Sequence, residues 1–132
     1  MDLQKLLILG ATGTIGVNTL DVVARHPDRF QVYGLAAGKN IELLYSQACT
    51  HRPKALIICD SKALDQWHAS GFSAKLREQL GYLPEIGGQG ELESLCQSEQ
   101  VDVVVAAIVG SAGLKPTLSA LQAGKRVLLA NK

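Results

Sequence analysis

Residues 6–16 read LLILGATGTIG, a short apolar run followed by glycines at positions 10, 13 and 16. The apolar run predicts a buried strand, and the residues from Thr14 onward have the apolar spacing of a helix. A glycine-rich turn between a strand and a helix is the arrangement that binds the pyrophosphate of a dinucleotide. This stretch therefore predicts both the start of the fold and the class of ligand.

Each residue type in this turn has a separate role. Gly10 allows a tight turn, Gly13 lets backbone N–H groups approach a pyrophosphate, and Gly16 lets the helix pack close to the strand. The helix N-terminus adds free N–H donors and a partial positive charge, and the hydroxyls of Thr12 and Thr14 can add further donors. The alternative is a purely structural turn, but a strand before it and a helix after it favour dinucleotide binding.

The rest of the chain alternates between apolar runs and helical patterns. Strands are expected at residues 6–9, 30–37, 55–59, 101–109 and 127–130, with a short strand near 85–86. Helices are expected at residues 14–25, 41–52, 63–69, 73–80, 90–97 and 116–124. Most of the runs are continuous, which is typical of strands buried on both faces. We therefore expect residues 1–132 to form one dinucleotide-binding α/β domain, with a doubly wound, mainly parallel sheet of the Rossmann type.

Four residues near the predicted strand and helix ends have structural interpretations. Asn40 and Ser61 are candidate N-caps of the second and third helices. Asp60, a single acid at a strand end, is expected to cap the third helix rather than to bind a metal. Trp67 lies in an amphipathic stretch and is expected to pack in the core.

The end of the second strand distinguishes NADP from NAD. An NAD site usually has an acidic residue there, about 20 residues past the glycines, to bind the ribose 2′-hydroxyl. Residues 30–40 read FQVYGLAAGKN, and no acid precedes Glu42. Gly38, Lys39 and Asn40 favour NADPH, because a lysine attracts the 2′-phosphate and an asparagine amide can donate to it. The alternative is a solvated Lys39 beside an Asn40 that only caps a helix.

Composition and charge exclude several classes of function. The chain has 132 residues, of which 47% are apolar and 19% charged, and this excludes intrinsic disorder. A net charge of +1 argues against a nucleic-acid surface, and no apolar run is long enough to span a membrane. The three cysteines form no CxxC motif, and the first residues do not resemble a signal peptide. We expect a cytoplasmic protein with no nucleic-acid or membrane partner.

Two further strand ends could contribute to a ligand site, since ligands bind at the carboxyl ends of parallel strands. Ser111, Ala112 and Gly113 form a small-residue loop that either admits a cofactor close to the backbone near residues 107–109 or is a short turn. Asn131 and Lys132 stand where the nicotinamide and the substrate would meet. No catalytic or metal-binding constellation is visible in the sequence.

Longer stretches carry a more specific pattern. They read GATGTIGVNTLDVV at 10–23, HPDRFQVYGLAAGKN at 26–40 and VVVAAIVGSAGLKPTLSALQAGKRVLLANK at 103–132. Together they resemble the N-terminal NADPH-binding domain of the 1-deoxy-D-xylulose 5-phosphate reductoisomerase family. The last stretch is the most specific, because AAIVGxAGLxPTL followed by AGKxxxLANK is not a general pattern of dinucleotide-binding domains.

The resemblance implies a set of site residues. In this family NADPH is bound at the positions of Thr12, Gly13, Thr14, Ile15, Gly38, Lys39, Asn40 and Asn131, and a sugar-phosphate substrate at the position of Lys132. The usual family loop is GSTGSIG, so Ala11 lacks a hydroxyl that the family has, whereas Thr14 keeps one. Binding should survive because backbone N–H groups make most of the phosphate contacts.

The resemblance also implies a reaction. The family rearranges 1-deoxy-D-xylulose 5-phosphate and reduces it with NADPH to 2-C-methyl-D-erythritol 4-phosphate, in non-mevalonate isoprenoid biosynthesis. Mg²⁺ or Mn²⁺ polarises the substrate, and the enzyme is a homodimer. Its metal ligands and catalytic loop follow the LANK motif. We therefore expect this chain to be a fragment that binds NADPH without catalysing the reaction.

Two other functions stay open on the sequence. One is a different NADP-dependent reductase, although none of the three tyrosines begins a Tyr-x-x-x-Lys motif and the cysteines are poorly placed for a semialdehyde dehydrogenase. The other is a non-catalytic NADP-sensing module, which would keep the glycine loop and Lys39. Sequence beyond Lys132 would distinguish these functions from the reductoisomerase.

Overall fold

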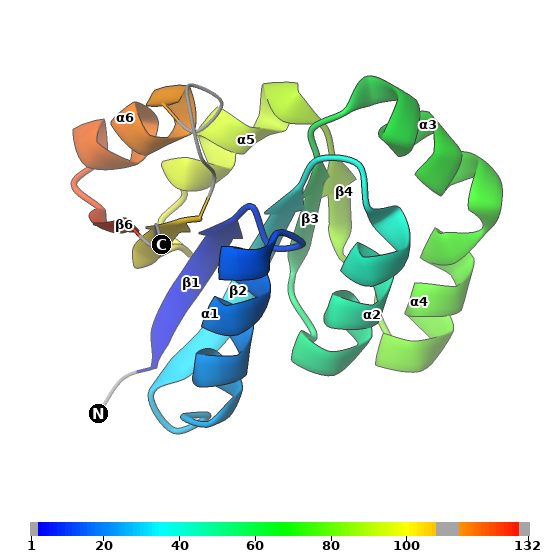
Figure 1. Ribbon diagram of the computed structural model, residues 1–132, viewed down its shortest axis with the longest axis horizontal. Helices are drawn as coiled ribbons and strands as arrows, with labels where there is room; N and C mark the ends of the chain where they lie inside the picture. The colour runs from blue at the N-terminus through cyan, green and yellow to red at the C-terminus, as the bar shows by residue number, and fades with distance from the viewer. Residues whose placement is uncertain (1–2, 108–113, 130–132) are drawn as a thin grey trace.

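A computed structural model describes residues 3–107 and 114–129, in which a six-stranded sheet lies between two layers of helices (Figure 1). The strands are β1 (Gln4–Leu9), β2 (Phe30–Ala37), β3 (Ala55–Ile58), β4 (Glu85–Gly87), β5 (Val103–Ala106) and β6 (Arg126–Leu129). The helices are α1 (Thr14–Ala24), α2 (Ile41–His51), α3 (Ser61–Ser70), α4 (Phe72–Leu80), α5 (Gln89–Cys96) and α6 (Leu114–Gln122).

The strand order is β4-β3-β2-β1-β5-β6, and every neighbouring pair is parallel. The chain runs outward from β1 through β2 and β3 to β4, and then returns to place β5 on the other side of β1. The predicted doubly wound parallel sheet is therefore confirmed. The order reverses between β1 and β5, and open α/β sheets bind ligands at such a point.

Two apolar layers hold the sheet and its helices together. Side chains of α1 to α4 pack on one face of the sheet, and those of α5 and α6 pack on the other. Leu7, Ile8 and Leu9 of β1 are fully buried between these layers. Burying each such side chain contributes about 1.5–3 kcal/mol relative to leaving it exposed. This packing fixes the ends of the central strands, where the glycine turn begins.

Two helix caps orient the segments that follow β2 and β3. The Asn40 side chain accepts a 3.1 Å hydrogen bond from the backbone N–H of Leu43, which confirms it as the cap of α2. The Asp60 carboxylate accepts a 3.0 Å bond from the N–H of Ala63. Asp60 is therefore the cap of α3, as expected, whereas the prediction that Ser61 caps this helix is wrong. Asp60 is in the extended conformation that an N-cap needs, and Ser61 is already the first helical residue.

The expectation that the apolar run near residues 127–130 is buried on both faces is wrong for β6. Leu128 is 46% exposed and Leu129 is 72% exposed. β6 is at the edge of the sheet and pairs only with β5 among the described strands, so one of its sides meets no further strand that could add to its burial. Trp67, in contrast, is fully buried as expected, and its indole N–H donates to the Ser73 hydroxyl at 2.8 Å.

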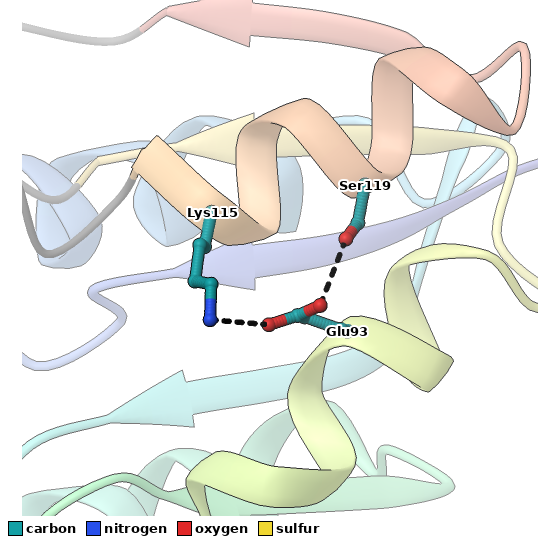
Figure 2. Close-up of polar contacts among 3 residues, drawn as sticks. All are labelled: Glu93, Lys115 and Ser119. Carbon is teal, nitrogen blue, oxygen red and sulfur yellow. Dashed lines mark hydrogen bonds and ion pairs between the residues drawn. The ribbon is translucent and has the colours of Figure 1, made fainter.

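Helices α5 and α6 also meet through polar side chains, as Figure 2 shows. The Ser119 hydroxyl donates to Glu93 Oε1 at 3.4 Å, and Lys115 Nζ lies 3.9 Å from Glu93 Oε2. The Lys115 side chain is 84% exposed, so water and salt screen this ion pair. The stability of this corner therefore comes mainly from apolar residues such as Leu92 and Ala120, which are fully buried.

Candidate nucleotide-binding site

A cavity of about 460 Å³ opens where β1, β2, β3 and β5 end. Its size is in the range of small-molecule and cofactor sites. Six residues that the sequence predicts for dinucleotide binding line it together: Gly10, Thr12, Gly13, Gly38, Lys39 and Asn40. The strand ends thus bring the glycine turn against a segment that lies about 25 residues further along the chain.

The glycine turn is tight because backbone hydrogen bonds hold it to β2. The N–H groups of Gly10 and Ala11 both donate to the Ala36 carbonyl at 2.9 Å, and the N–H of Gly13 donates to the Gly10 carbonyl at 3.2 Å. Gly10 has φ of 79°, in the left-handed region where glycine avoids a steric cost. The role assigned to Gly10 in the sequence, a tight turn, is confirmed.

The other two glycines differ in how much space surrounds them. A Cβ atom at Gly16 would collide with the Gly10 carbonyl oxygen and lie 2.7 Å from backbone carbons of Ala11. A Cβ atom at Gly13 would meet only the Gly10 oxygen, at an ordinary contact distance of 3.6 Å. Gly16 is therefore needed for close packing of α1 on the turn. Nothing in the described protein fills the space at Gly13, which is the position that a pyrophosphate would approach.

Helix α1 begins at this turn with no side-chain cap. Gly13 is its N-cap residue, and no side chain accepts a hydrogen bond from the first turn. The first N–H groups of a helix have no partner within it, and they favour an anion. Thr14 and Ile15 stand in this first turn but do not line the cavity, and Thr14 is exposed to solvent.

The segment after β2 brings a positive charge and an amide to the cavity. Lys39 is exposed and forms no salt bridge with any residue that the structure describes. Asn40 caps α2 through its Oδ1 atom, so its amide N–H groups stay available as donors. The two interpretations of Asn40, helix cap and phosphate ligand, are therefore compatible.

Part of the cavity wall was not predicted from the sequence. Cys59, Gln89 and Leu92 line it, together with Ala36 and Ala37 of β2. Burial raises the pKa of the Cys59 thiol, so this side chain is protonated and uncharged near neutral pH. Cys59 directly follows β3, and the rule that ligands bind at carboxyl ends of strands could have identified it. No sequence signal identifies Gln89 and Leu92, because their place depends on how α5 packs.

Some candidate positions fall outside the part of the chain that the structure describes. These are Ser111, Ala112, Gly113, Asn131 and Lys132. Ala107, four residues before Ser111, is described and lines the cavity. Within residues 3–107 and 114–129, no group of three or more His, Cys, Asp or Glu side chains is placed to bind a metal. None of the helices in the same residues has the length and apolar content needed to span a bilayer.

Comparisons with known proteins agree on one family. The family model described as 1-deoxy-D-xylulose 5-phosphate reductoisomerase matches residues 6–132. A curated relative of that name from Stutzerimonas stutzeri (strain A1501) is 47% identical over 132 residues, which is 97% of this chain and 31% of the relative.

Solved structures give the same result. The crystal structure of DOX-P reductoisomerase in complex with NADPH, fosmidomycin and magnesium is 38% identical, with a TM-score of 0.84 over 98% of this chain and 30% of that chain. A 1-deoxy-D-xylulose 5-phosphate reductoisomerase from Zymomonas mobilis in complex with NADPH is 36% identical, with a TM-score of 0.78, covering 98% of this chain and 32% of that one. The chain thus spans about a third of the length of the proteins it matches.

Proposed function

The chain belongs to the 1-deoxy-D-xylulose 5-phosphate reductoisomerase family, and we propose that residues 1–132 are the NADPH-binding domain of a member of this family. The glycine turn and Lys39 line the same cavity, and this arrangement supports the proposal. A pyrophosphate needs the first of these features, and a 2′-phosphate needs a cation nearby. NADPH contains both phosphate groups, joined by an adenosine.

The residues present fit this cofactor. The pyrophosphate binds at residues 10–16, where a Cβ-free Gly13 and the uncapped N-terminus of α1 leave room and donors for it. The 2′-phosphate binds at Lys39 and Asn40 beside Gly38. The adenine lies against the largely apolar wall of Cys59 and Leu92. The nicotinamide end extends past Ala107. From the family resemblance we assign Asn131 to the binding of NADPH and Lys132 to the binding of the substrate.

We extend the proposal to a whole protein of the kind that the relatives represent, of whose length this chain spans about a third. That protein rearranges 1-deoxy-D-xylulose 5-phosphate and reduces it to 2-C-methyl-D-erythritol 4-phosphate. NADPH, when bound, supplies the hydride for the reduction, and the residues named above bind and orient it. The protein is a homodimer in the cytoplasm, and its other ligand is the sugar phosphate.

A divalent metal, Mg²⁺ or Mn²⁺, belongs to the proposed whole reaction, but the described residues do not fit one. They contain no cluster of suitable ligands, so we assign the metal to no side chain among them and derive no step through it. The contribution of this chain is the binding and orientation of the cofactor.

Titration of the chain with NADPH and with NADH tests the proposal. We expect saturable binding of NADPH at one site and weaker binding of NADH, because NADH lacks the phosphate that Lys39 would contact. Binding of neither nucleotide would contradict the assignment of this domain. Equal affinity for the two would contradict the assignment of Lys39 and leave the glycine turn as the only phosphate site.

A further inference from the structure

Gln47 of α2 is an unusual side chain in this fold. Among the described residues, only Gln47 and Ser119 are polar and buried, and Gln47 is 8% exposed. Its side-chain amide donates a 2.8 Å hydrogen bond to the carbonyl of Ala11, 36 residues earlier in the chain. A buried amide of α2 thus holds the backbone of the glycine turn, next to the cavity.

This bond leaves the other half of the Gln47 amide without a partner. Oε1 is buried and has no hydrogen-bond partner among the described residues. Rotating the amide would not help, because Oε1 would then face the Ala11 carbonyl oxygen, and two acceptors repel. An unpaired buried acceptor lowers stability, and such groups call for an explanation beyond packing. The amide keeps this orientation because only its NH₂ group can donate to the Ala11 carbonyl.

The hydrogen bond from Gln47 to the Ala11 carbonyl also orients the N–H group of Thr12. The Ala11 carbonyl and the Thr12 N–H belong to the same peptide group, which is planar and trans, so they point in opposite directions. No cis peptide bond occurs in the described chain. Gln47 holds the carbonyl on its own side, and the Thr12 N–H therefore points away from Gln47. Thr12 lines the cavity, and Gln47 does not.

The next peptide group toward the N-terminus is fixed as well. The Ala11 N–H donates to the Ala36 carbonyl of β2 at 2.9 Å. The two bonds tie Ala11 to β2 on one side and to α2 on the other. The Ala11–Thr12 peptide therefore has one orientation before any ligand arrives, and a site fixed in advance loses less entropy on binding.

We propose that Gln47 is a positioning residue for NADPH: it orients the Ala11–Thr12 peptide so that the Thr12 N–H donates to the cofactor pyrophosphate. This inference rests on the proposed function and refines it. Gln47 acts through Ala11 and touches neither phosphate. Its effect is confined to the pyrophosphate half of the site, because the 2′-phosphate half is formed by Lys39 and Asn40.

The test uses two ligands that divide the site. NADPH carries both a pyrophosphate and a 2′-phosphate, whereas adenosine 2′-monophosphate carries only the latter. Gln47→Met keeps the length and burial of the side chain and removes the donor. We expect this variant to bind NADPH about tenfold more weakly, the loss of one well-placed hydrogen bond. We expect its affinity for adenosine 2′-monophosphate to be unchanged. Lys39→Ala should weaken the binding of both ligands.

Two further variants separate positioning from stability. Ala48→Gly loosens the same helix at a buried position next to Gln47, and we expect it to leave both affinities unchanged. If Gln47→Met does not fold, Gln47→Leu removes the same donor. A variant that still binds adenosine 2′-monophosphate has a folded cavity.

Two results would overturn the inference. One is an unchanged affinity for NADPH in the folded Gln47 variant. The other is an equal loss of affinity for NADPH and for adenosine 2′-monophosphate, which would indicate a general structural role of Gln47. If the unaltered chain bound neither ligand, the proposed function itself would be contradicted, and the inference with it.

Discussion

Gly16 packs so closely against Gly10 that a Cβ atom at position 16 would collide with the Gly10 carbonyl oxygen. Because the colliding atoms are backbone, a side chain there forces α1 away from the turn. We expect Gly16→Ala to lower the free energy of unfolding by about 3 kcal/mol, the upper end for an overpacked site. Urea denaturation followed by circular dichroism measures this.

Gly90 provides the matched control for that substitution. It lies in α5, and a Cβ atom there has nothing within 4 Å. Gly90→Ala should leave the stability unchanged or raise it by up to about 1 kcal/mol, since alanine favours a helix. Equal midpoints for the Gly16 variant and the unaltered chain would show that the turn yields readily, which would contradict the need for close packing of α1 at Gly16.

A substitution at Gly13 should affect NADPH binding far more than stability, because the space around Gly13 is open in the protein. We expect Gly13→Val to fold, with a loss of about 1 kcal/mol because valine is a poorer N-cap than glycine. NADPH binding should be abolished, because the side chain occupies the approach to the pyrophosphate. Calorimetric titration at a temperature where the variant is folded checks this. Unchanged affinity would mean that the glycine turn is only structural.

Lys39 is expected to carry the selectivity between cofactors. Lys39→Ala should weaken NADPH binding roughly tenfold or more, the range for a charge-assisted hydrogen bond, and leave NADH binding as it is. Lys75→Ala is the control, because Lys75 is an exposed lysine of α4 and does not line the cavity. A Lys39 variant that still preferred NADPH as strongly as the unaltered chain would refute this assignment.

Cys59 offers a chemical readout of the same cavity. Burial raises the pKa of its thiol, so little thiolate is present at pH 8 and alkylation by iodoacetamide should be slow. The rate should rise as the pH rises, and saturating NADPH should slow it because the cofactor covers Cys59. Mass spectrometry of the labelled peptide measures both effects.

Cys96 is the internal control for that labelling. It is fully buried in the apolar layer between the sheet and helices α5 and α6. Burial together with the nearby Glu93 raises the pKa of its thiol to about 11. Its labelling should be negligible with or without NADPH in the folded chain. Labelling of Cys59 that NADPH does not slow would argue against a nucleotide at this wall.

Much of the fold follows from sequence because the signals are local. The apolar run at 6–9 and the three glycines predict β1, the turn and α1. The lysine at position 39 and the absence of an acid after β2 together predict a 2′-phosphate contact. The exposure of Leu129 does not follow from the sequence, since an apolar strand reads the same at an edge as in the centre. The sequence also does not predict the roles of Gln89 and Gln47. Gln89 lines the cavity, and Gln47 lies behind the glycine turn, only because of how α5 and α2 pack. Local patterns predict the phosphate contacts, whereas tertiary contacts determine the wall and the support behind the turn.

A crystal structure of the chain with NADPH would locate both phosphate groups at once. We expect the pyrophosphate beside Gly13 at the start of α1 and the 2′-phosphate within hydrogen-bond distance of Lys39. A nucleotide bound elsewhere would contradict the proposed NADPH site, for example one in the separate cavity of about 330 Å³ beneath α5 that Tyr33 and Glu91 line.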